Sequence, residues 1–261
     1  MVLTVNETIE KAALDLYKNG EEVKPLKWQS VEVEHPMIEV TQRYYQMKMP
    51  FNQTILQSQC NADQPWSEDH FQERVSGEPL NPGNQYYNWP YYDHSKDNDR
   101  FREGDKEFSH SYMERYWPPK DLKGIRYNYG DLNNLIDRMK ADPLTRQAYL
   151  SVWYPEDQVD IGERVPCTLG YHFLIRNDKI DCTYHIRSCD IRRHFKNDIY
   201  MTIRLAQWVK DKLDMDLKMG NLNMWIGSLH AWSFERFTLK NGLLGPEDKS
   251  MKHNTPKKWQ K

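Results

Sequence analysis

The sequence lacks three features that would each define a class of protein. No apolar run approaches the roughly 18 residues that a membrane span needs. The first residues, MVLTVNETIEKAALDLY, lack the basic-then-apolar layout of a signal peptide. A large excess of charge of one sign is also missing, because 36 Lys and Arg nearly balance 38 Asp and Glu, for a net charge of −2. Without a basic field, the protein is not expected to hold a nucleic-acid backbone or a membrane surface directly.

Cysteine is scarce, with four residues among 261, which excludes a disulfide scaffold and predicts reduced thiols in the cytoplasm. Three possible metal ligands, Cys182, His185 and Cys189, have the spacing C-x2-H-x3-C. On one strand, alternation would put Cys182 on the face opposite His185 and Cys189. No fourth ligand follows at a zinc-like spacing, so no metal site is predicted. His172 alternates with apolar residues, which predicts a core histidine.

Aromatic residues compensate for a low hydrophobic content of 38%, because they reach 13% and include nine Trp and sixteen Tyr. Side chains of this size bury large areas each, so a sizeable core is feasible. We predict a single domain over residues 1–261. Residues 58–119 are rich in Pro, Asn, Trp and Tyr, which indicates a long, packed, irregular insertion with a functional role. Residues 246–261 are polar and basic and are expected to fray.

Apolar periodicity separates the expected helices from the expected strands. Helical spacing predicts helices over residues 4–19, 131–141, 198–217 and 233–240. Runs of β-branched and aromatic residues predict strands over residues 148–154, 168–175, 179–186 and 222–226. Asn177-Asp178 predicts a hairpin turn between the second and third strands. The segment 68–74 is interpreted as a solvated helix face. Because the strands bunch together, the pattern favours an α+β fold.

Two short segments could carry chemistry. Cys167 follows Pro166, which fixes the backbone before a thiol at the start of a strand. Taken alone, such a cysteine is more often an inert buried side chain. Twenty residues later comes Arg187-Ser-Cys-Asp190, in which a guanidinium beside a hydroxyl could clamp a phosphate or hold a nearby thiol as thiolate. The simpler interpretation is an ion pair between Arg187 and Asp190 at the end of a strand.

In order along the chain, these segments resemble the motifs of the thymidylate synthase family. That family has a D-P-x-S-R-R phosphate loop, a strand ending in S-x-W-N, a P-C nucleophile, R-S-x-D, a base-reading residue at a helix start and H-x-Y. The matching segments are Asp142-Pro-Leu-Thr-Arg146, Ser151-Val-Trp-Tyr154, Pro166-Cys167, Arg187-Ser-Cys-Asp190, Asn197-Asp198 and His230-Ala-Trp232. Tyr129-Gly130 resembles the family's Y-G. The resemblance implies a thymidylate synthase-like fold, with a large mixed β-sheet flanked by helices, and a sheet-to-sheet homodimer.

The base-reading position differs from that of thymidylate synthases, which have Asn where this chain has Asp198. Asp198 resembles the deoxycytidylate hydroxymethylase branch found in phages, as do Cys167-Thr168 and the run Gly227-Ser-Leu-His230. A carboxylate only accepts hydrogen bonds, so it suits the N4 amine of cytosine and faces uracil O4 with negative charge. If Asp198 carries a proton, it can also donate to cytosine N3.

Two further positions depart from the family motifs. The second Arg of the phosphate loop is Gln147, which removes one charge from phosphate binding. The Tyr of H-x-Y is Trp232, which can donate a hydrogen bond but not accept one. The contact with the sugar 3′-hydroxyl must therefore differ. Ribose acceptance, as in the cytidylate hydroxymethylases of nucleoside antibiotic pathways, stays open.

The resemblance also implies catalytic roles. Cys167 would add to C6 of a pyrimidine nucleoside monophosphate, and C5 would then attack the methylene of 5,10-methylenetetrahydrofolate, the cosubstrate. Glu73 is the best candidate for the family's glutamate that orders water and relays protons, with Glu68 or Glu78 as alternatives. Tyr129 would assist loss of the C5 proton. The predicted product is 5-hydroxymethyl-dCMP, and residue types alone do not separate hydroxymethyl from methyl transfer.

The binding roles follow from the same resemblance. The residues expected to bind the nucleotide are Arg187 and Ser188 at the phosphate, Arg146 from the other subunit, Asn197 and Asp198 at the base, and His230 and Trp232 at the sugar. Asp190 would hydrogen-bond the pterin ring and Trp117 would stack near the folate. Alternatives within the fold are a dCMP methyltransferase, a CMP or dUMP hydroxymethylase and a thymidylate synthase. An alternative of another class is a catalytically dead nucleotide-binding subunit.

Overall fold

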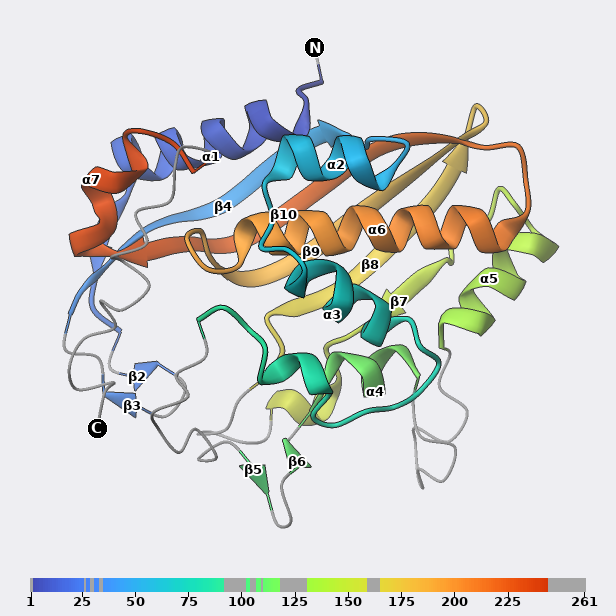
Figure 1. Cartoon of the computed structure of the whole chain (residues 1–261), viewed down its shortest axis with the longest axis horizontal. Helices are drawn as coiled ribbons and strands as arrows, with labels where there is room; N and C mark the ends of the chain where they lie inside the picture. The colour runs from blue at the N-terminus through green and yellow to red at the C-terminus, as the bar shows by residue number, and fades with distance from the viewer. Residues whose placement is uncertain are drawn as a thin grey trace.

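The computed structural model describes most of the chain (Figure 1). The described residues are 2–25, 27–28, 31–32, 35–91, 102–103, 107–108, 110–117, 131–158 and 165–243. Tyr129 and the tail at 246–261 lie outside the described residues, as does part of the segment 58–119. In the described part of the chain, no helix has the length and apolar character required to cross a membrane. The division into one domain over 1–261 stays a prediction.

A six-stranded mixed sheet forms the centre of the fold, which confirms the predicted α+β class. In spatial order its strands are β1 (Glu21–Val23), β4 (Met37–Lys48), β10 (Lys218–Trp232), β9 (Lys179–Asp190), β8 (Thr168–Arg176) and β7 (Tyr149–Ser151). Neighbouring strands are antiparallel except β9 and β10, which are parallel. The described part also holds two short hairpins, formed by β2 (Lys27–Trp28) with β3 (Val31–Glu32) and by β5 (Arg102–Glu103) with β6 (Glu107–Phe108).

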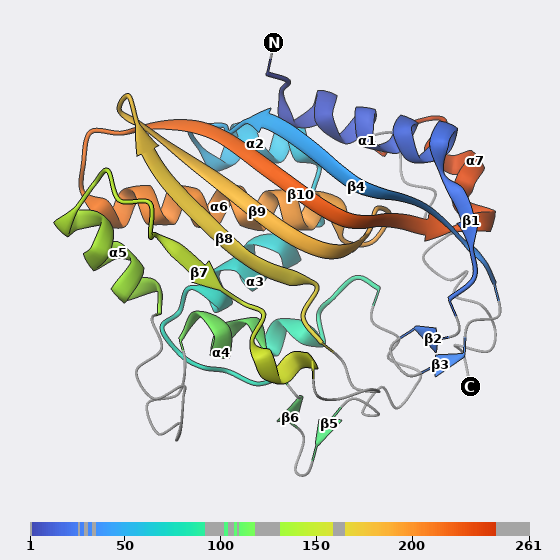
Figure 2. The same cartoon turned by 180° about the vertical axis from the view of Figure 1, so that it is seen from behind.

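Helices lie on one side of this sheet. The longest, α6 (Phe195–Leu213), runs along the sheet and buries Ile199, Ile203, Ala206 and Val209 (Figure 1). The other helices are α1 (Val5–Asn19), α2 (Gln53–Cys60), α3 (Trp66–Arg74), α4 (Tyr112–Tyr116), α5 (Leu132–Ala141) and α7 (Arg236–Leu239), with short 3-10 turns η1 (Asn84–Tyr86), η4 (Pro155–Gln158) and η5 (Ser233–Glu235). From behind, no described helix crosses the sheet (Figure 2).

Most predicted elements are confirmed, with shifted ends. The predicted strand over 222–226 is the middle of the 15-residue strand β10, and the strand over 148–154 shortens to Tyr149–Ser151. Strand β4 was not predicted, because its polar residues face the open side of the sheet and Gln42, at φ 52°, interrupts its regular extension. The segment 58–119 is less irregular than expected, since it includes α3 and α4.

Three local expectations are wrong. Helix α3 is not a solvated face, because Phe71 and Arg74 are 2% and 7% exposed. His172 is not in the core: it lies partly exposed in β8, with Nε2 3.0 Å from the backbone oxygen of Arg146. Cys189 is buried, as Cys182 is, because the alternation of buried and partly buried residues along β9 shifts by one after Ile186.

Candidate active site

Cys167 lies directly before the first residue of β8, beside Arg187 of the neighbouring strand β9. The Arg187 backbone N donates to the Cys167 oxygen at 2.9 Å. The guanidinium donates to the oxygens of Pro166 (2.8 Å) and Val165 (3.0 Å), which leaves Nη2 3.9 Å from the Cys167 sulfur. Cys167 is only partly buried. A fixed cation beside an accessible thiol favours its thiolate form, which is the reactive one.

Next to this thiol lies a buried group of side chains, Thr168, Tyr112, Tyr184 and Arg74, of which the motifs indicated only Thr168. Thr168, next to Cys167, donates to the Tyr112 hydroxyl at 3.3 Å and lies 2.9 Å from the Tyr184 hydroxyl. The Arg74 guanidinium stands over the Tyr112 ring, 4.3 Å from its centroid. Burial raises the pKa of Tyr112 to about 12, and Cys167 adds to the rise. The one sequence signal for this region is the capping box of Ser111 with residue 114, which starts α4 at Tyr112.

Asp198 lies in the first turn of α6, facing the same group. The Cys189 thiol donates to its carboxylate across 3.7 Å. Burial raises the pKa of Asp198 to about 7, while Arg74 and the Cys189 hydrogen bond act in the opposite direction. The pKa of Asp198 therefore rises because burial outweighs the opposing effects of Arg74 and the Cys189 hydrogen bond.

Asn197, next to Asp198, has its amide committed to the protein. Its oxygen accepts from the Asp63 backbone N (3.0 Å) and the Ser67 hydroxyl (2.8 Å). Its nitrogen donates to the Asp63 carboxylate (2.9 Å) and to the Arg193 oxygen (3.2 Å). These contacts fix the start of α6 to the segment that joins α2 to α3. A direct contact of Asn197 with substrate stays a prediction, and the contacts present give it a positioning role.

Asn197→Ala is expected to lower the free energy of unfolding by about 1–3 kcal/mol, because it leaves the backbone N–H of Asp63 without its acceptor. Urea unfolding measures the difference. Asn133→Ala, at an exposed position of α5, is the control and should change stability by less than about 0.5 kcal/mol. A loss for Asn197→Ala as small as the control's would contradict the positioning role.

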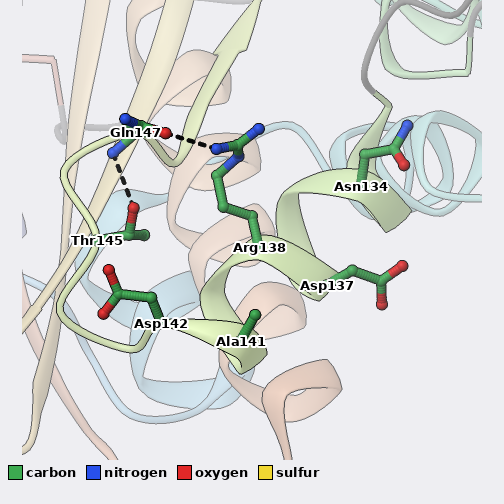
Figure 3. Close-up of a pocket in the computed structure, with 7 residues that line it drawn as sticks. All are labelled: Asn134, Asp137, Arg138, Ala141, Asp142, Thr145 and Gln147. Atoms are coloured by element: carbon green, nitrogen blue, oxygen red, sulfur yellow. Dashed lines mark hydrogen bonds between the residues drawn. The ribbon is translucent and has the colours of Figure 1, made fainter.

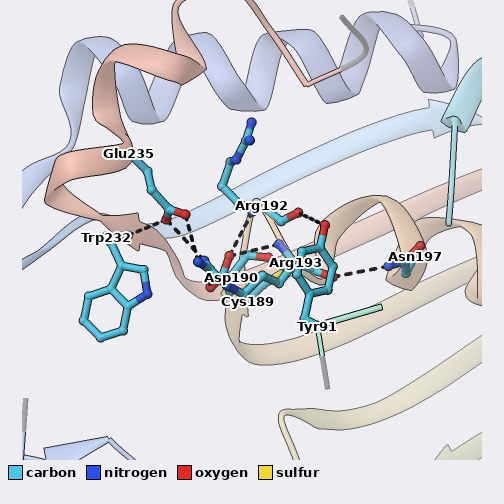
Figure 4. Close-up of polar contacts among 8 residues, drawn as sticks. All are labelled: Tyr91, Cys189, Asp190, Arg192, Arg193, Asn197, Trp232 and Glu235. Carbon is cyan, nitrogen blue, oxygen red and sulfur yellow. Dashed lines mark hydrogen bonds and ion pairs between the residues drawn. The ribbon is translucent and has the colours of Figure 1, made fainter. Parts of the chain in front are cut away.

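Asp190 does not pair with Arg187, as the simpler interpretation had it, but caps the turn before α6 (Figure 4). Its Oδ1 accepts from the backbone N of Arg192 and Arg193, and its Oδ2 accepts from the Arg193 guanidinium at 2.9 Å. Burial acts to raise the pKa of Asp190, but Arg193 and the nearby histidines hold it below its usual value. An ionised carboxylate offers about four acceptor positions. Three are used, so Asp190 can accept from one more N–H donor. A contact of Asp190 with a pterin stays a prediction.

The two residues predicted at the sugar lie at the end of β10. His230 pairs in register with Asp190 of β9, is buried, and has Nδ1 3.3 Å from the Ser228 hydroxyl. Trp232 lies two residues further; its ring stacks on Phe234 with centroids 6.2 Å apart, and its backbone N donates to Glu235 (Figure 4). Their contacts with a sugar stay predictions.

The three candidate glutamates occupy different surroundings. Glu68 is bound by Arg204 and Tyr200, and Glu78 is exposed. Glu73 is nearly buried, with Oε2 3.3 Å from His70 Nδ1 and Oε1 accepting from the residue 85 backbone N. Glu73 is therefore the best placed of the three, although among the described residues its contacts are with His70 and residue 85 rather than with Cys167.

Trp117, expected to stack near the folate, is 7% exposed. Its Nε1 donates to the Arg74 backbone oxygen at 2.9 Å, and its ring meets that of Trp208 edge-on at 6.2 Å. Trp117 thus lies in the core and fixes the backbone of Arg74. Stacking on a planar ligand does not fit this placement.

The phosphate-loop segment lies beside a separate surface pocket of about 650 Å³ between α5 and residues 142–147 (Figure 3). Gln147, which stands where the family motif has its second arginine, accepts from Arg138 Nη1 at 2.6 Å. The Arg138 guanidinium therefore places a positive charge next to this position. Arg146 is exposed on this loop. Among the described residues, Arg146 makes no contact with Cys167 or Arg187 of the same chain.

Comparison with known proteins identifies the family. Residues 82–244, more than half of the chain, match the family model described as thymidylate synthase. The chain belongs to the thymidylate synthase family. A solved relative, the thermostable thymidylate synthase A from Bacillus subtilis, superposes with a TM-score of 0.65 at 16% identity, over 91% of this chain and 83% of that one. This likeness confirms the predicted thymidylate synthase-like fold.

Curated members of the family match shorter stretches. A putative thymidylate synthase of Methanosarcina barkeri is 24% identical over 143 residues, which are 55% of this chain and 62% of that protein. The deoxyuridylate hydroxymethyltransferase of Bacillus phage SP01 is 34% identical over 105 residues, 38% of this chain and 27% of that protein. The matches thus span less than two thirds of these relatives.

Proposed function

We propose that this member of the thymidylate synthase family transfers a hydroxymethyl group to C5 of dCMP, with 5,10-methylenetetrahydrofolate as the one-carbon donor. The observation that carries the proposal is the carboxylate of Asp198 in the family's base-reading position, across the site from a thiol flanked by an arginine. The acceptor oxygens of Asp198 complement the N4 amine of cytosine.

In this mechanism Cys167 forms a bond to C6, and the electron pair of the C5=C6 bond makes C5 a carbon nucleophile. Arg187 favours the thiolate before attack and, with Ser188, holds the phosphate. Asp198 holds the base so that C6 faces the sulfur. The folate, when bound, supplies a one-carbon unit, and Asp190 is the residue with acceptor capacity for its pterin. The C5 proton is then lost and the remaining C–N bond to tetrahydrofolate breaks, which releases the folate. Water adds to the one-carbon unit left on C5, and the thiolate leaves C6.

The active site is completed by a second copy of the chain, because Arg146 lies on an exposed loop away from Cys167. The proposed homodimer joins the uncovered faces of two sheets (Figure 2). Tyr44, Tyr149 and Trp225 are 44%, 45% and 50% exposed on the described chain. Aromatic side chains of this kind are common anchors of protein interfaces.

Mixing two inactive variants, Cys167→Ser and Arg146→Ala, is expected to restore activity. Each heterodimer would have one site with an intact thiol and an intact arginine, so a 1:1 mixture should regain about a quarter of the parent activity after random exchange. Turnover of the mixture, with exchange verified by mass spectrometry of tagged subunits, measures this. Exchange without recovery would count against a shared site.

A second candidate function is hydroxymethylation of dUMP. The observation that favours it is the 34% identity to a phage deoxyuridylate hydroxymethyltransferase. The methyl-transferring alternative has the weaker likeness to a putative thymidylate synthase, at 24% identity. The CMP-accepting and catalytically inactive alternatives have no such support.

Release of tritium from C5-labelled nucleotides tests the proposal. With methylenetetrahydrofolate present, labelled dCMP should lose tritium to water faster than labelled dUMP. Faster release from dUMP would favour the second candidate, and no release from either would contradict C5 chemistry altogether. Unlabelled CMP as competitor separates ribose from deoxyribose acceptance.

A further inference from the structure

Arg74 is a buried cation whose direct contacts, among the described residues, are with uncharged groups. The residue is 7% exposed, and among the described residues no carboxylate lies within ion-pair distance of its guanidinium. Its Nε and Nη2 converge at 3.2 and 3.0 Å on a single acceptor, Nε2 of His70. A guanidinium has five N–H donors. Tyr116 also makes a side-chain hydrogen bond with Arg74, so two of the five remain for another group. A buried charge without a partner is a costly arrangement that often marks a functional site.

The position of Arg74 is fixed from three sides. The Tyr112 ring lies under the guanidinium, and Trp117 binds its backbone oxygen. His70 stacks on Trp66 with centroids 5.2 Å apart and is neutral, because burial and Arg74 lower its pKa to about 4. Since Nε2 of His70 accepts from Arg74, Nδ1 carries the hydrogen and donates toward Glu73 across 3.3 Å.

Asp198 is a carboxylate near Arg74 that does not contact it directly. Arg74 lowers the pKa of Asp198, and Asp198 raises the pKa of Arg74. Both charges, and Cys167 as well, affect the pKa of Tyr112. A donor and an acceptor therefore face one region beside the thiol from different helices, α3 and α6. The edge of cytosine presents the complementary pair, an N3 acceptor beside an N4 amine donor.

We propose that Arg74 is a specificity-determining residue, whose N–H groups donate to N3 of cytosine while Asp198 accepts from the N4 amine, with His70 and Glu73 as positioning residues. This inference rests on the proposed function of the site. Uracil presents N3–H to the Arg74 donors and O4 to the Asp198 carboxylate, so both contacts become repulsive. The arrangement reads cytosine with an ionised Asp198 and needs no proton on that carboxylate.

Arg74→Met tests the inference through the ratio of kcat/KM for dCMP to that for dUMP. The ratio should fall at least about tenfold, because the donor to N3 is lost and the repulsion of N3–H is relieved. The matched control is Arg204→Met. Arg204 is also a partly buried arginine, with its guanidinium 4.9 Å from the Phe71 ring, but it is paired with Glu68. That variant should leave the ratio unchanged.

A pH profile separates this role from a merely structural one. The groups that face Asp198 are Arg74 from α3, Tyr112 from α4, and Cys189 and Tyr184 from β9. With an ionised acceptor required, kcat/KM for dCMP should rise with pH through about 7, the pKa of Asp198. Arg74→Met removes the positive charge and should move this inflection to higher pH, whereas Arg204→Met should not.

A second pair of variants keeps the test decisive if Arg74→Met does not fold. His70→Met removes the acceptor that orients Arg74 and should lower the nucleotide ratio, while His70→Gln keeps an acceptor for Arg74 and a donor for Glu73 and should restore most of it. A parent that processes dCMP, with ratios unchanged in the folded variants, overturns the inference and leaves the proposed function intact. A parent that prefers dUMP overturns the cytosine function and this inference with it.

Discussion

Cys167→Ser is expected to abolish turnover and to leave nucleotide binding largely intact. The serine hydroxyl cannot replace a thiolate as a nucleophile toward C6, whereas the phosphate-binding arginine is a separate side chain. Arg187 keeps its bonds to the backbone oxygens of Pro166 and Val165, so the cation stays in place. Turnover by product formation and dCMP binding by calorimetry measure the two effects.

Retained activity above about 1% of the parent would contradict the assignment of the nucleophile. Cys182→Ala is the control, because this thiol is also in the paired strands but is fully buried, and burial raises the pKa of its thiol above the ordinary value. Its loss should affect stability more than turnover. A variant of Cys182 as inactive as Cys167→Ser would mean that thiol chemistry had been assigned to the wrong residue.

Asp198→Asn is expected to raise the ratio of kcat/KM for dUMP to that for dCMP by about tenfold or more, since one mispaired buried polar group costs roughly 1–3 kcal/mol. The amide can face uracil O4 with an N–H and uracil N3–H with its oxygen, so dUMP gains what dCMP loses. Steady-state kcat/KM for both nucleotides in both proteins gives the ratio.

Asp15→Asn is the control for this substitution. Asp15 lies on α1 and is bound by Arg43 and Tyr45, so its loss removes a carboxylate without changing the base-reading group. The nucleotide ratio should stay at the parent value. A ratio unchanged in Asp198→Asn as well would remove Asp198 from base choice.

The order of motifs predicted that Cys167 and Arg187 lie together, because the two residues belong to paired strands. Cys167 and Arg187 are twenty residues apart, and the hairpin of β8 with β9 brings them side by side. Such a pairing follows from a turn and two strands, both of which leave a periodic signal. The position of Asp198 follows in the same way from the start of α6.

Arg74 and Tyr112 could not be found in this way. They come from short helices within a long aromatic segment, where apolar residues occur at no regular period. Their place beside Asp198 depends on tertiary packing, in which Asn197 fixes the segment before α3 against α6. The same packing buries Phe71 and Arg74 in a helix whose composition is that of a solvated one.

The mass of the nucleotide product tests the central claim most directly. The protein is incubated with methylenetetrahydrofolate and dCMP, CMP or dUMP, and each nucleotide is weighed by mass spectrometry. One-carbon transfer followed by hydration should add roughly 30 mass units to dCMP, whereas transfer followed by reduction would add roughly 14. A gain of roughly 30 units on dCMP, absent in Cys167→Ser, is the expected result. A gain of roughly 14, a gain on dUMP alone, or no gain on any of the three would contradict C5 hydroxymethylation of a cytosine nucleotide.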